Sequence, residues 1–557
     1  MSKQLFTVVT AGVVCAIAAQ VWAAPDQDIN ERDAVSAIAS NVQPAYYDQR
    51  STPLTPTLSS SISTKPATEV LLYASLVDYI YNETSRQNIW SNNELNAQLT
   101  LQLEMVNLAG FSPLFELRVK HMQSLYQSGA SNEYDRAATD TLLLYISYIA
   151  AVPDLGKQWY FSESLIEALP RPSATEVHQL LLAIENNTLA NYLLSLSPPM
   201  LQQSGFENVY IDLLAKSQVE LTAYEQVGLT RKGDRIEPDP YIHLLDRLAD
   251  SDIYVEVRED GKFDHSLESA IKEFQRLYGL EDDGIIGPNT LHWLNKPAQE
   301  KLRVLALNAE RSRLWPQQRE HIILVNVPSF ELKYWGKGEP RFESRVIVGR
   351  LTRQTPIFAT KMDSLIVNPT WNVPWKIMVK DIIPKVKNDP TYLFSQRIEI
   401  LEGWHNRVTV DPTMIDWKEV QPKQFPYRMR QQAGESNALG QYKFNTPNER
   451  AIFLHDTPGK QLFNESSRAY SSGCIRVEHA DKFAQVLLEH QGKLLDDLST
   501  YRANKAISFR TRIPVHIIYQ TAWLEDGKAH FRADVYQYDN RRGGVTETAL
   551  IKNERGQ

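Results

Sequence analysis

The sequence predicts a multidomain α+β protein, and three observations support this fold class. The length of 557 residues exceeds that of one ordinary domain. Apolar residues recur at helical spacing from about 68 to 235, which predicts a helical scaffold. From about residue 318 short β-branched segments take over, which predicts a mostly-β domain within 301–557. A small helical module at 236–300 separates these two regions.

The N-terminus has the pattern of a secretory signal peptide over residues 1–23. Lys3 supplies a positive charge, residues 5–19 are apolar, and residues 21–23 form a small-residue cleavage site. An uncleaved membrane anchor is the alternative, because the apolar run approaches the length that spans a bilayer. We therefore expect export, and we expect residues 24–67, rich in Ser, Thr and Pro, to be a flexible linker.

The composition is that of an ordinary globular protein, with 43% hydrophobic and 23% charged residues. The formal net charge is -8, and no broad basic patch is visible. This balance argues against nucleic acid as a partner. A second apolar run, at 141–152, is too short to span a bilayer and predicts a buried helix.

The module at 236–300 contains an amphipathic helix followed by a turn. Within residues 266–280 the apolar side chains share one helical face: Leu267, Ala270, Ile271, Phe274, Leu277 and Tyr278. Asp283 and Gly284 predict a turn, and Gly287 followed by Pro288 predicts the start of another helix. These are core and turn residues, so they identify a fold without proving that the module binds a ligand.

The mostly-β region is interrupted by a long insertion. We expect strands in the segments 322–327, 330–335, 346–349, 364–368, 451–455, 514–522 and 530–538. Residues 376–432 break this pattern with Pro384, Pro390, Trp404, Trp417, Pro422 and Pro426. Long insertions in compact domains are often lids or binding loops, so we predict a lid, with an exposed decoration as the alternative. Trp404 and Trp417 would pack the lid down or fill its own small core.

The stretch SSGCIR at 471–476 holds one of only two cysteines, and the other, Cys15, falls in the predicted signal peptide. After cleavage Cys474 is alone, so a disulfide within the chain is impossible. A lone thiol in an oxidising compartment is either buried and inert or a nucleophile. His455, nineteen residues earlier, ends a strand-like run and could exchange protons with the thiol.

The residues around the cysteine favour the nucleophile. Gly473 allows a sharp turn, and an amphipathic pattern follows from Ala480. We therefore expect Cys474 on a turn that leads into a helix, where the helix N-terminus and a nearby imidazole favour the thiolate. Free main-chain N–H groups at such a turn can stabilise an oxyanion. A metallopeptidase is disfavoured, because no His-Glu-x-x-His run or zinc-ligand pair is present; we expect no metal.

Two parts of the chain resemble known families. The module resembles the small three-helix peptidoglycan-binding domain, through Phe263, Ala270, Phe274, Gln275, Gly279, Leu280, Asp283, Gly284, Gly287, Thr290 and Leu294. His455 with the stretch 471–476 resembles the signature of L,D-transpeptidases with a YkuD-type catalytic domain. Further matches are Asn368-Pro369-Thr370-Trp371, Asn437-Ala438-Leu439-Gly440 and Lys443-Phe444. The whole chain resembles the large periplasmic members of that family.

The resemblance implies roles for particular residues. Cys474 would be the nucleophile and His455 the base and acid, with the main-chain carbonyl of Asp456 as the third member. We expect the side chain of Asp456 to be exposed and idle. The main-chain N–H groups of Gly473 and Cys474 would form the oxyanion site. Many relatives have a histidine where this chain has Ser472, so the two main-chain N–H groups would have to suffice here. The remaining candidates for contacting substrate are Arg476, Trp371, Tyr442 and Ser472.

The implied reaction joins two peptidoglycan stem peptides without a cofactor. Cys474 would attack a donor tetrapeptide, release its terminal D-alanine, and pass the acyl group to a meso-diaminopimelate amine as a 3→3 cross-link. Water or a lipoprotein lysine as acceptor would make the protein an L,D-carboxypeptidase or an anchoring enzyme. Two competing hypotheses are a non-catalytic wall-binding protein and an unrelated cysteine protease. We expect a periplasmic location, at the inner membrane if the signal segment stays uncleaved, with other cell-wall enzymes as further partners.

Overall fold

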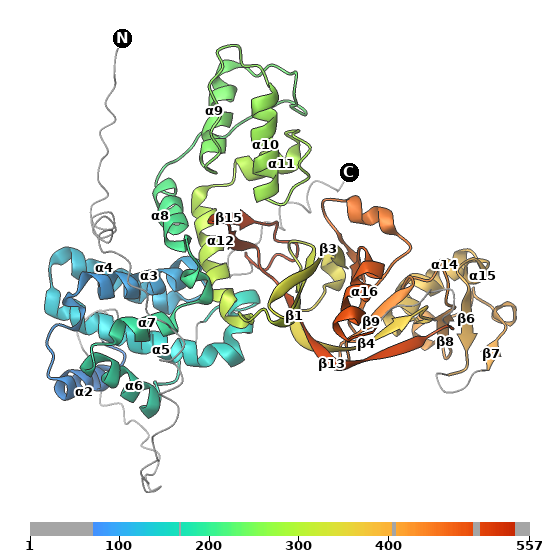
Figure 1. The fold of residues 1–557 in the computed structure, drawn as a ribbon, viewed down its shortest axis with the longest axis horizontal. Coiled ribbons are helices and arrows are strands. Elements are labelled where there is room, and N and C mark those ends of the chain that lie inside the picture. Colours follow the sequence, from blue (N-terminus) through green and yellow to red (C-terminus); the bar gives the residue numbers. More distant parts are fainter. Residues whose placement is uncertain (1–70, 166–168, 404–407, 494–501, 541–557) are drawn as a thin grey trace, which may run out of the picture. The chain divides into compact units, whose positions relative to one another are not determined.

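The computed structural model describes residues 71–165, 169–403, 408–493 and 502–540 (Figure 1). The predicted signal peptide, the predicted linker and Trp404 lie outside these residues. The chain divides into two compact units. The first is formed by Phe115–Tyr148, Leu169–Leu196 and the described part of Met1–Glu104. The second is formed by Met105–Leu114, Ile149–Ala168 and Ser197–Gln557.

The first unit is helical, as the apolar spacing predicts. The helices that contribute to it are α2 (Ala74–Thr84), α3 (Asn93–Ala109), α4 (Pro113–Ser128), α5 (Ser131–Phe161), α6 (Ala174–Glu185) and α7 (Leu189–Leu196). The apolar run that begins at residue 141 lies inside α5, and its first eight residues are buried. Phe115 packs edge-to-face against Tyr148, with ring centroids 5.6 Å apart. Across the described residues, no helix combines the length and apolar character needed to cross a membrane.

The module in the second unit consists of α9 (Pro238–Ala249), α10 (His265–Leu277) and α11 (Pro288–Leu294). All six residues of the predicted apolar face are buried. The buried side chain of Gln275 fixes the following turn: its Nε2 donates to Asp283 Oδ1 at 2.9 Å, and its Oε1 accepts from the Gly284 N–H at 2.9 Å. These bonds explain why the module has Gln, Asp and Gly at those places.

The mostly-β region is built on a nine-stranded sheet in the order β11-β3-β12-β10-β9-β4-β13-β1-β2. Strand β2 also pairs with β3, so the sheet closes on itself into a barrel-like core. The strands are β1 (His321–Asn326), β2 (Glu331–Gly336), β3 (Glu339–Gly349), β4 (Phe358–Val367), β9 (Tyr442–Asn445), β10 (Leu454–His455), β11 (Ala469–Ser471), β12 (Ile475–Val477) and β13 (Lys505–Ile518). Helix α16 (Ala480–His490) packs its buried face on this sheet.

Two of the predicted strands are much shorter than expected. The segment 451–455 contributes only β10, because Ala451 has a φ of +52° and lies in a turn held by Asn448. The segment 530–538 contributes only the end of β15 (Lys528–Phe531), which pairs with β14 (Ala522–Glu525). Beyond β15 the Asp534 carboxylate accepts main-chain N–H groups of the same segment, so the chain turns instead of extending.

The insertion is a folded lobe with its own small sheet, and it begins before the predicted residue 376. Strands β5 (Trp371–Asn372), β8 (Arg428–Gln431), β6 (Ile398–Leu401) and β7 (Thr409–Val410) pair in that order. Helical segments α13 (Trp375–Ile377), η5 (Met378–Ile382), α14 (Ile383–Asn388) and α15 (Tyr392–Ser395) cover it. Trp417 is buried in the core of this lobe with Met378, Ile383 and Met429.

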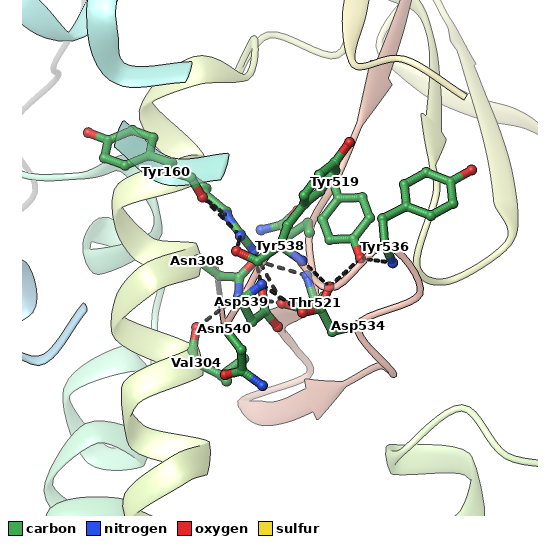
Figure 2. A network of polar contacts seen from close by, with 12 residues as sticks. Tyr160, Val304, Asn308, Tyr519, Thr521, Asp534, Tyr536, Tyr538, Asp539 and Asn540 are labelled. Carbon is green, nitrogen blue, oxygen red and sulfur yellow. Dashed lines mark hydrogen bonds and ion pairs between the residues drawn. The ribbon is translucent and has the colours of Figure 1, made fainter. Parts of the chain in front are cut away.

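The C-terminal segment is tied to α12 (Ala298–Arg311) by a buried polar network (Figure 2). Arg311 is fully buried, donates to Asp539 Oδ1 at 2.6 Å and also donates to the carbonyl of Tyr160 at 3.0 Å. Asn308 and Thr521 exchange two hydrogen bonds of 2.8 and 2.9 Å. A buried charge is tolerated when it is paired and hydrogen-bonded, so this network fixes the segment that ends the described chain.

Candidate active site

Cys474 lies on a turn between two strands. The turn joins β11 to β12, and α16 starts only after β12 has ended. The expectation that the cysteine precedes a helix N-terminus directly is therefore wrong. A helix dipole acts mainly within one turn of the helix end, so it is not the source of any thiolate stabilisation here.

Strand register places the candidate residues on one face of the sheet. His455 on β10 is in register with Arg476 on β12 and with Lys443 on β9. Side chains alternate along a strand, so Cys474 belongs to the face of Arg476, opposite the buried Ile475. The sulfur lies 3.7 Å from the carbonyl oxygen of Ala451. A thiol, an imidazole and two cations thus share one small surface.

The imidazole of His455 is held by its own main chain. Its Nδ1 lies 2.5 Å from the carbonyl oxygen of Asp456, and the side chain is only 5% exposed. A carbonyl only accepts, so Nδ1 is the protonated nitrogen and Nε2 is free to accept a proton. Burial, followed by the charge of Arg476, lowers the pKa of His455 to about 3. The ring is therefore neutral at physiological pH.

The electrostatics of Cys474 differ from the expectation of a stable thiolate. Burial raises the pKa of the Cys474 thiol, and the main-chain hydrogen bond from Phe453 and the charges of Lys443 and Arg476 only partly oppose this effect. Without substrate the site therefore holds a neutral thiol and a neutral imidazole on one face of the sheet. Such a pair reacts by moving the thiol proton to the imidazole as the sulfur attacks.

The geometry of the turn decides which main-chain N–H groups are available. Gly473 has a φ of +117°, which favours glycine, and its N–H donates to Ser471 Oγ at 3.0 Å. The same hydroxyl donates to the carbonyl of Cys474 at 2.5 Å. The expectation that the Gly473 N–H serves an oxyanion is thus wrong, because Ser471 already occupies it. Among the described residues the Cys474 N–H has no partner, so it is the donor that remains.

The Asp456 side chain is not the exposed, idle group we expected. It is buried, and its carboxylate accepts from the Gln441 N–H at 2.9 Å and pairs with Lys460. A Cβ on Gly440, whose φ is +59°, would meet this carboxylate at 2.3 Å. The closeness of the Asp456 carboxylate to the main chain of Gly440 explains why the 437–440 motif ends in glycine. Asp456 therefore anchors the loop beside the histidine with its side chain and orients the ring with its carbonyl.

A cleft of about 490 Å³ runs between the insertion and the sheet. It is lined by Thr370, Trp371, Asn372, Val373, Pro374, Trp375, Met378, Arg428, Leu439, Lys443, Ala451 and Phe453. Trp371, a predicted substrate contact, is among them. The cleft adjoins the cysteine, because Ala451 lines it and its carbonyl is the contact of the sulfur. This lining includes two cations and no carboxylate, which suits an anionic substrate.

Tyr442 was expected near substrate, and the structure contradicts this. It is buried on the face of β9 opposite Lys443, with Phe444, which packs on Phe483 of α16. Its apolar ring fills the core, in keeping with strand alternation. The more informative position in this strand is Lys443. Its signal in the sequence was a charge alternating with two aromatic residues.

Ser472 precedes Cys474 in the turn, and Arg476 follows it on β12. Ser472 is exposed, and its hydroxyl accepts from Arg353 Nη1 at 2.9 Å. Arg353 also pairs with Asp381 of the insertion, Nη2 to Oδ1 at 2.9 Å. Arg476 is half-buried beside the histidine, and its buried Nε has no partner among the described residues. The sequence contains no indication of the role of Arg353, because no motif around it points to Ser472, which lies 119 positions further along the chain.

No group of His, Cys, Asp or Glu suited to a metal ion is present among the described residues. A cysteine and a histidine on one sheet face beside a cleft are an arrangement that cysteine acyl-transfer enzymes use on several unrelated folds. Residues 320–516 match the family model YkuD, described as "L,D-transpeptidase catalytic domain". Residues 243–294 match the model described as "Putative peptidoglycan binding domain".

One curated relative extends over most of the chain. A protein of Haemophilus influenzae named "Putative L,D-transpeptidase" is 30% identical over 474 residues, which are 85% of this chain and 79% of the relative. The chain belongs to the L,D-transpeptidase family.

The solved structures that match include an L,D-transpeptidase from Stackebrandtia nassauensis, 14% identical, covering 53% of this chain and 96% of that one with a TM-score of 0.20. An L,D-transpeptidase from Mycobacterium smegmatis is 8% identical, covering 36% of this chain and 58% of that one with a TM-score of 0.19.

Proposed function

We propose that this protein forms 3→3 cross-links between peptidoglycan stem peptides through a thioester on Cys474. The observation that supports this most strongly is the shared sheet face of His455 and the cysteine, at the edge of a cationic cleft. The hydrogen bond between the ring Nδ1 and the Asp456 carbonyl leaves Nε2 as the base. These are the parts that a two-step acyl transfer needs.

The first step forms the acyl-enzyme. His455 Nε2 takes the thiol proton while the sulfur attacks the carbonyl carbon of the third residue of a tetrapeptide stem. The Cys474 N–H donates to the oxygen that becomes negative. The tetrahedral intermediate then collapses: the bond to the terminal D-alanine breaks, the imidazolium protonates the leaving amine, and a thioester remains.

The second step transfers the acyl group. The side-chain amine of meso-diaminopimelate on another stem attacks the thioester carbonyl and loses a proton to the imidazole. The carbon–sulfur bond breaks, the new amide forms, and the imidazolium returns the proton to the sulfur. With water as acceptor the same chemistry releases a tripeptide, and with a lipoprotein lysine it anchors that protein. Because each acceptor gives a different product, analysis of the products identifies the acceptor.

The insertion is the candidate lid for this reaction. It supplies one wall of the cleft, including Trp371 and Trp375, and Trp375 is 47% exposed. Asp381 of the insertion reaches Arg353, which in turn donates to Ser472 beside the nucleophile. A closed insertion would exclude water from the thioester and favour an amine acceptor.

The family membership and the second matched domain support peptidoglycan as the substrate, and we extend the proposal to a periplasmic location. The basis for this location is the N-terminal secretory pattern. Cell fractionation with detection of the mature N-terminus by mass spectrometry tests it. Recovery of the uncleaved chain from membranes would favour a membrane anchor instead.

The deciding experiment is intact-protein mass spectrometry with a tetrapeptide muropeptide. The wild type should gain the mass of the acyl group, minus D-alanine, and Cys474→Ala should not. Muropeptide products should then include the 3→3 dimer. No adduct on the wild type, with the chain shown to be folded, would contradict the proposed function, and a non-catalytic wall-binding protein would be the better explanation.

A further inference from the structure

The carbonyl of Gly473, directly before the nucleophile, is anchored by a residue far away in the sequence. Thr355 lies in the loop before β4, and its hydroxyl donates to Gly473 O at 2.8 Å. Both residues are buried. A peptide unit is planar and trans, so its C=O and the following N–H point in opposite directions. The bond from Thr355 therefore also fixes the direction of the Cys474 N–H.

Thr355 is itself held from two sides. Its Oγ1 accepts from the Gly349 N–H at 2.8 Å, and its own N–H donates to the hydroxyl of Tyr536 at 3.0 Å. The Tyr536 hydroxyl donates to Gly349 O at 2.6 Å, which closes a ring of hydrogen bonds. A Cβ on Gly349 would lie 2.2 Å from the carbonyl of Arg353, so only glycine allows the loop to come this close. The ring leaves the Thr355 hydroxyl one orientation, towards Gly473.

Tyr536 is positioned by the C-terminal network. Its N–H donates to the Tyr519 hydroxyl at 2.8 Å, and Tyr519 donates to Asp534 (Figure 2). Tyr536 is fully buried, and burial raises its pKa to about 12, so its hydroxyl keeps the proton that it donates. The hydrogen bonds that hold the turn around Cys474 thus continue through Tyr536 into the C-terminal segment, which takes no direct part in the chemistry.

We infer that Thr355 is a positioning residue, which aims the Cys474 N–H at the developing oxyanion, and that Tyr536 holds Thr355 in place. The need for such a device follows from the site itself. The Gly473 N–H is occupied by Ser471, and no histidine precedes the glycine, so the oxyanion depends heavily on one N–H. A single donor is effective only when its direction is fixed before the reaction starts. This inference rests on the proposed acyl-transfer chemistry of Cys474.

The test compares two reactions of the same sulfur. Acetylation by p-nitrophenyl acetate passes through a tetrahedral oxyanion, whereas alkylation by iodoacetamide displaces iodide without one. Both are followed by intact mass, with Cys474→Ala as the blank. In Thr355→Val, which keeps the shape but loses the hydroxyl, acetylation should fall about 10- to 100-fold, approaching the loss expected for a missing oxyanion donor. Alkylation should stay within about threefold, and Thr355→Ser should restore acetylation.

Tyr536→Phe gives an independent test if the valine variant does not fold. It should slow acetylation about three- to tenfold and leave alkylation unchanged, because Thr355 keeps its hydroxyl but loses one restraint. Equal acetylation in the wild type and a folded Thr355→Val, or an equal fall in both reactions, would overturn the inference. Failure of both variants to fold would assign these residues to folding alone and overturn it too. A wild type that is acetylated but inert towards muropeptides would refute the proposed function and leave this inference standing.

Discussion

His455 Nδ1 lies 2.5 Å from the main-chain carbonyl oxygen of the next residue, Asp456. A main-chain carbonyl cannot be lost by substitution of a side chain, and it carries no charge that would raise the histidine pKa strongly. The imidazole therefore keeps a fixed tautomer while staying neutral. Together with the raised pKa of the Cys474 thiol, this arrangement describes a thiol and an imidazole that are both uncharged until substrate arrives.

The nucleophile is tested by replacing Cys474 with serine. The change is nearly isosteric, so the protein should fold. A serine hydroxyl has a far higher pKa and is a weaker nucleophile at this site, so we expect cross-linking to fall at least about 100-fold. Muropeptide dimer formation measures the effect, and Cys474→Ala sets the background. A serine variant that kept more than a few per cent of the wild-type rate would contradict thiol catalysis.

The depressed pKa of His455 predicts how stability depends on pH. In the folded protein this pKa is about 3, against an ordinary value of 6.5. Between these two values the unfolded chain binds a proton that the folded protein does not. Stability therefore falls as the pH drops below about 6.5, by up to about 2 kcal/mol at pH 5 from this group.

The variant His455→Gln isolates that contribution, since the other buried histidines stay unchanged. Its unfolding free energy, measured by chemical denaturation, should decline less between pH 7 and pH 5 than that of the wild type. Acylation should be lost at both pH values. Identical pH slopes for the two proteins would mean that His455 is not buried as a neutral ring.

Lys443 should set the acidity of the nucleophile. Its charge lowers the Cys474 pKa against the effect of burial, so removing it should raise that pKa further. In Lys443→Met the rate of alkylation by iodoacetamide should shift to higher pH, and the rate at pH 8 should fall. Lys443→Arg keeps the charge and should resemble the wild type. If the methionine and arginine variants had the same pH profile of alkylation, the charge of Lys443 would not be what lowers the pKa of Cys474.

The sequence predicted a helical region, a small module and a mostly-β domain in the order that the structure has them, because these depend on local patterns. The pairing of Cys474 with His455 came from the family signature, and it stays a prediction, which the strand register supports by placing both residues on one sheet face. Helical spacing, strand alternation and the glycine turn each act over a few residues. The module at 243–294 was equally visible, since its turn is built from neighbours such as Gln275 and Asp283.

The parts that the sequence did not reveal depend on contacts between distant residues. Thr355 meets Gly473 across 118 positions, and Tyr536 meets Gly349 across 187. The occupied Gly473 N–H and the buried Asp456 carboxylate also required three-dimensional packing. The prediction that Tyr442 contacts substrate failed for a simpler reason. Strand β9 runs beside the site, but side chains alternate along it, so Lys443 faces the site and Tyr442 faces the core.

The thiol should also react with strained acyl donors. A β-lactam ring resembles an activated peptide terminus, so Cys474 should open a carbapenem and hold it as a thioester. We expect a mass increase equal to one carbapenem in the wild type and none in Cys474→Ala, with most penicillins reacting poorly. An increase that persists in the alanine variant would place the acylation on another residue.

The ion pair between Arg353 and Asp381 should control the fate of the thioester. It joins the insertion to the catalytic turn, and both side chains are partly exposed, at 20% and 29%. A partly exposed pair of this kind contributes about 0.5–1 kcal/mol to holding the insertion where the structure places it. Asp381→Asn removes the charge without changing the size, so the insertion should open more often and admit water. The ratio of cross-linked dimer to tripeptide should then fall about two- to fivefold, while acetylation of Cys474 by a small donor stays unchanged.

The matched control for this prediction is Arg430→Gln. Arg430 pairs with Glu399 at 2.9 Å within the insertion, with similar exposure, but does not reach the catalytic turn. Its loss should leave the product ratio at the wild-type value. The ratio is read by liquid chromatography of muropeptides after equal consumption of donor. If Asp381→Asn gave the wild-type ratio in a folded protein, the insertion would not act as a lid. Docking of another cell-wall enzyme would then be the better explanation for a lobe with its own core.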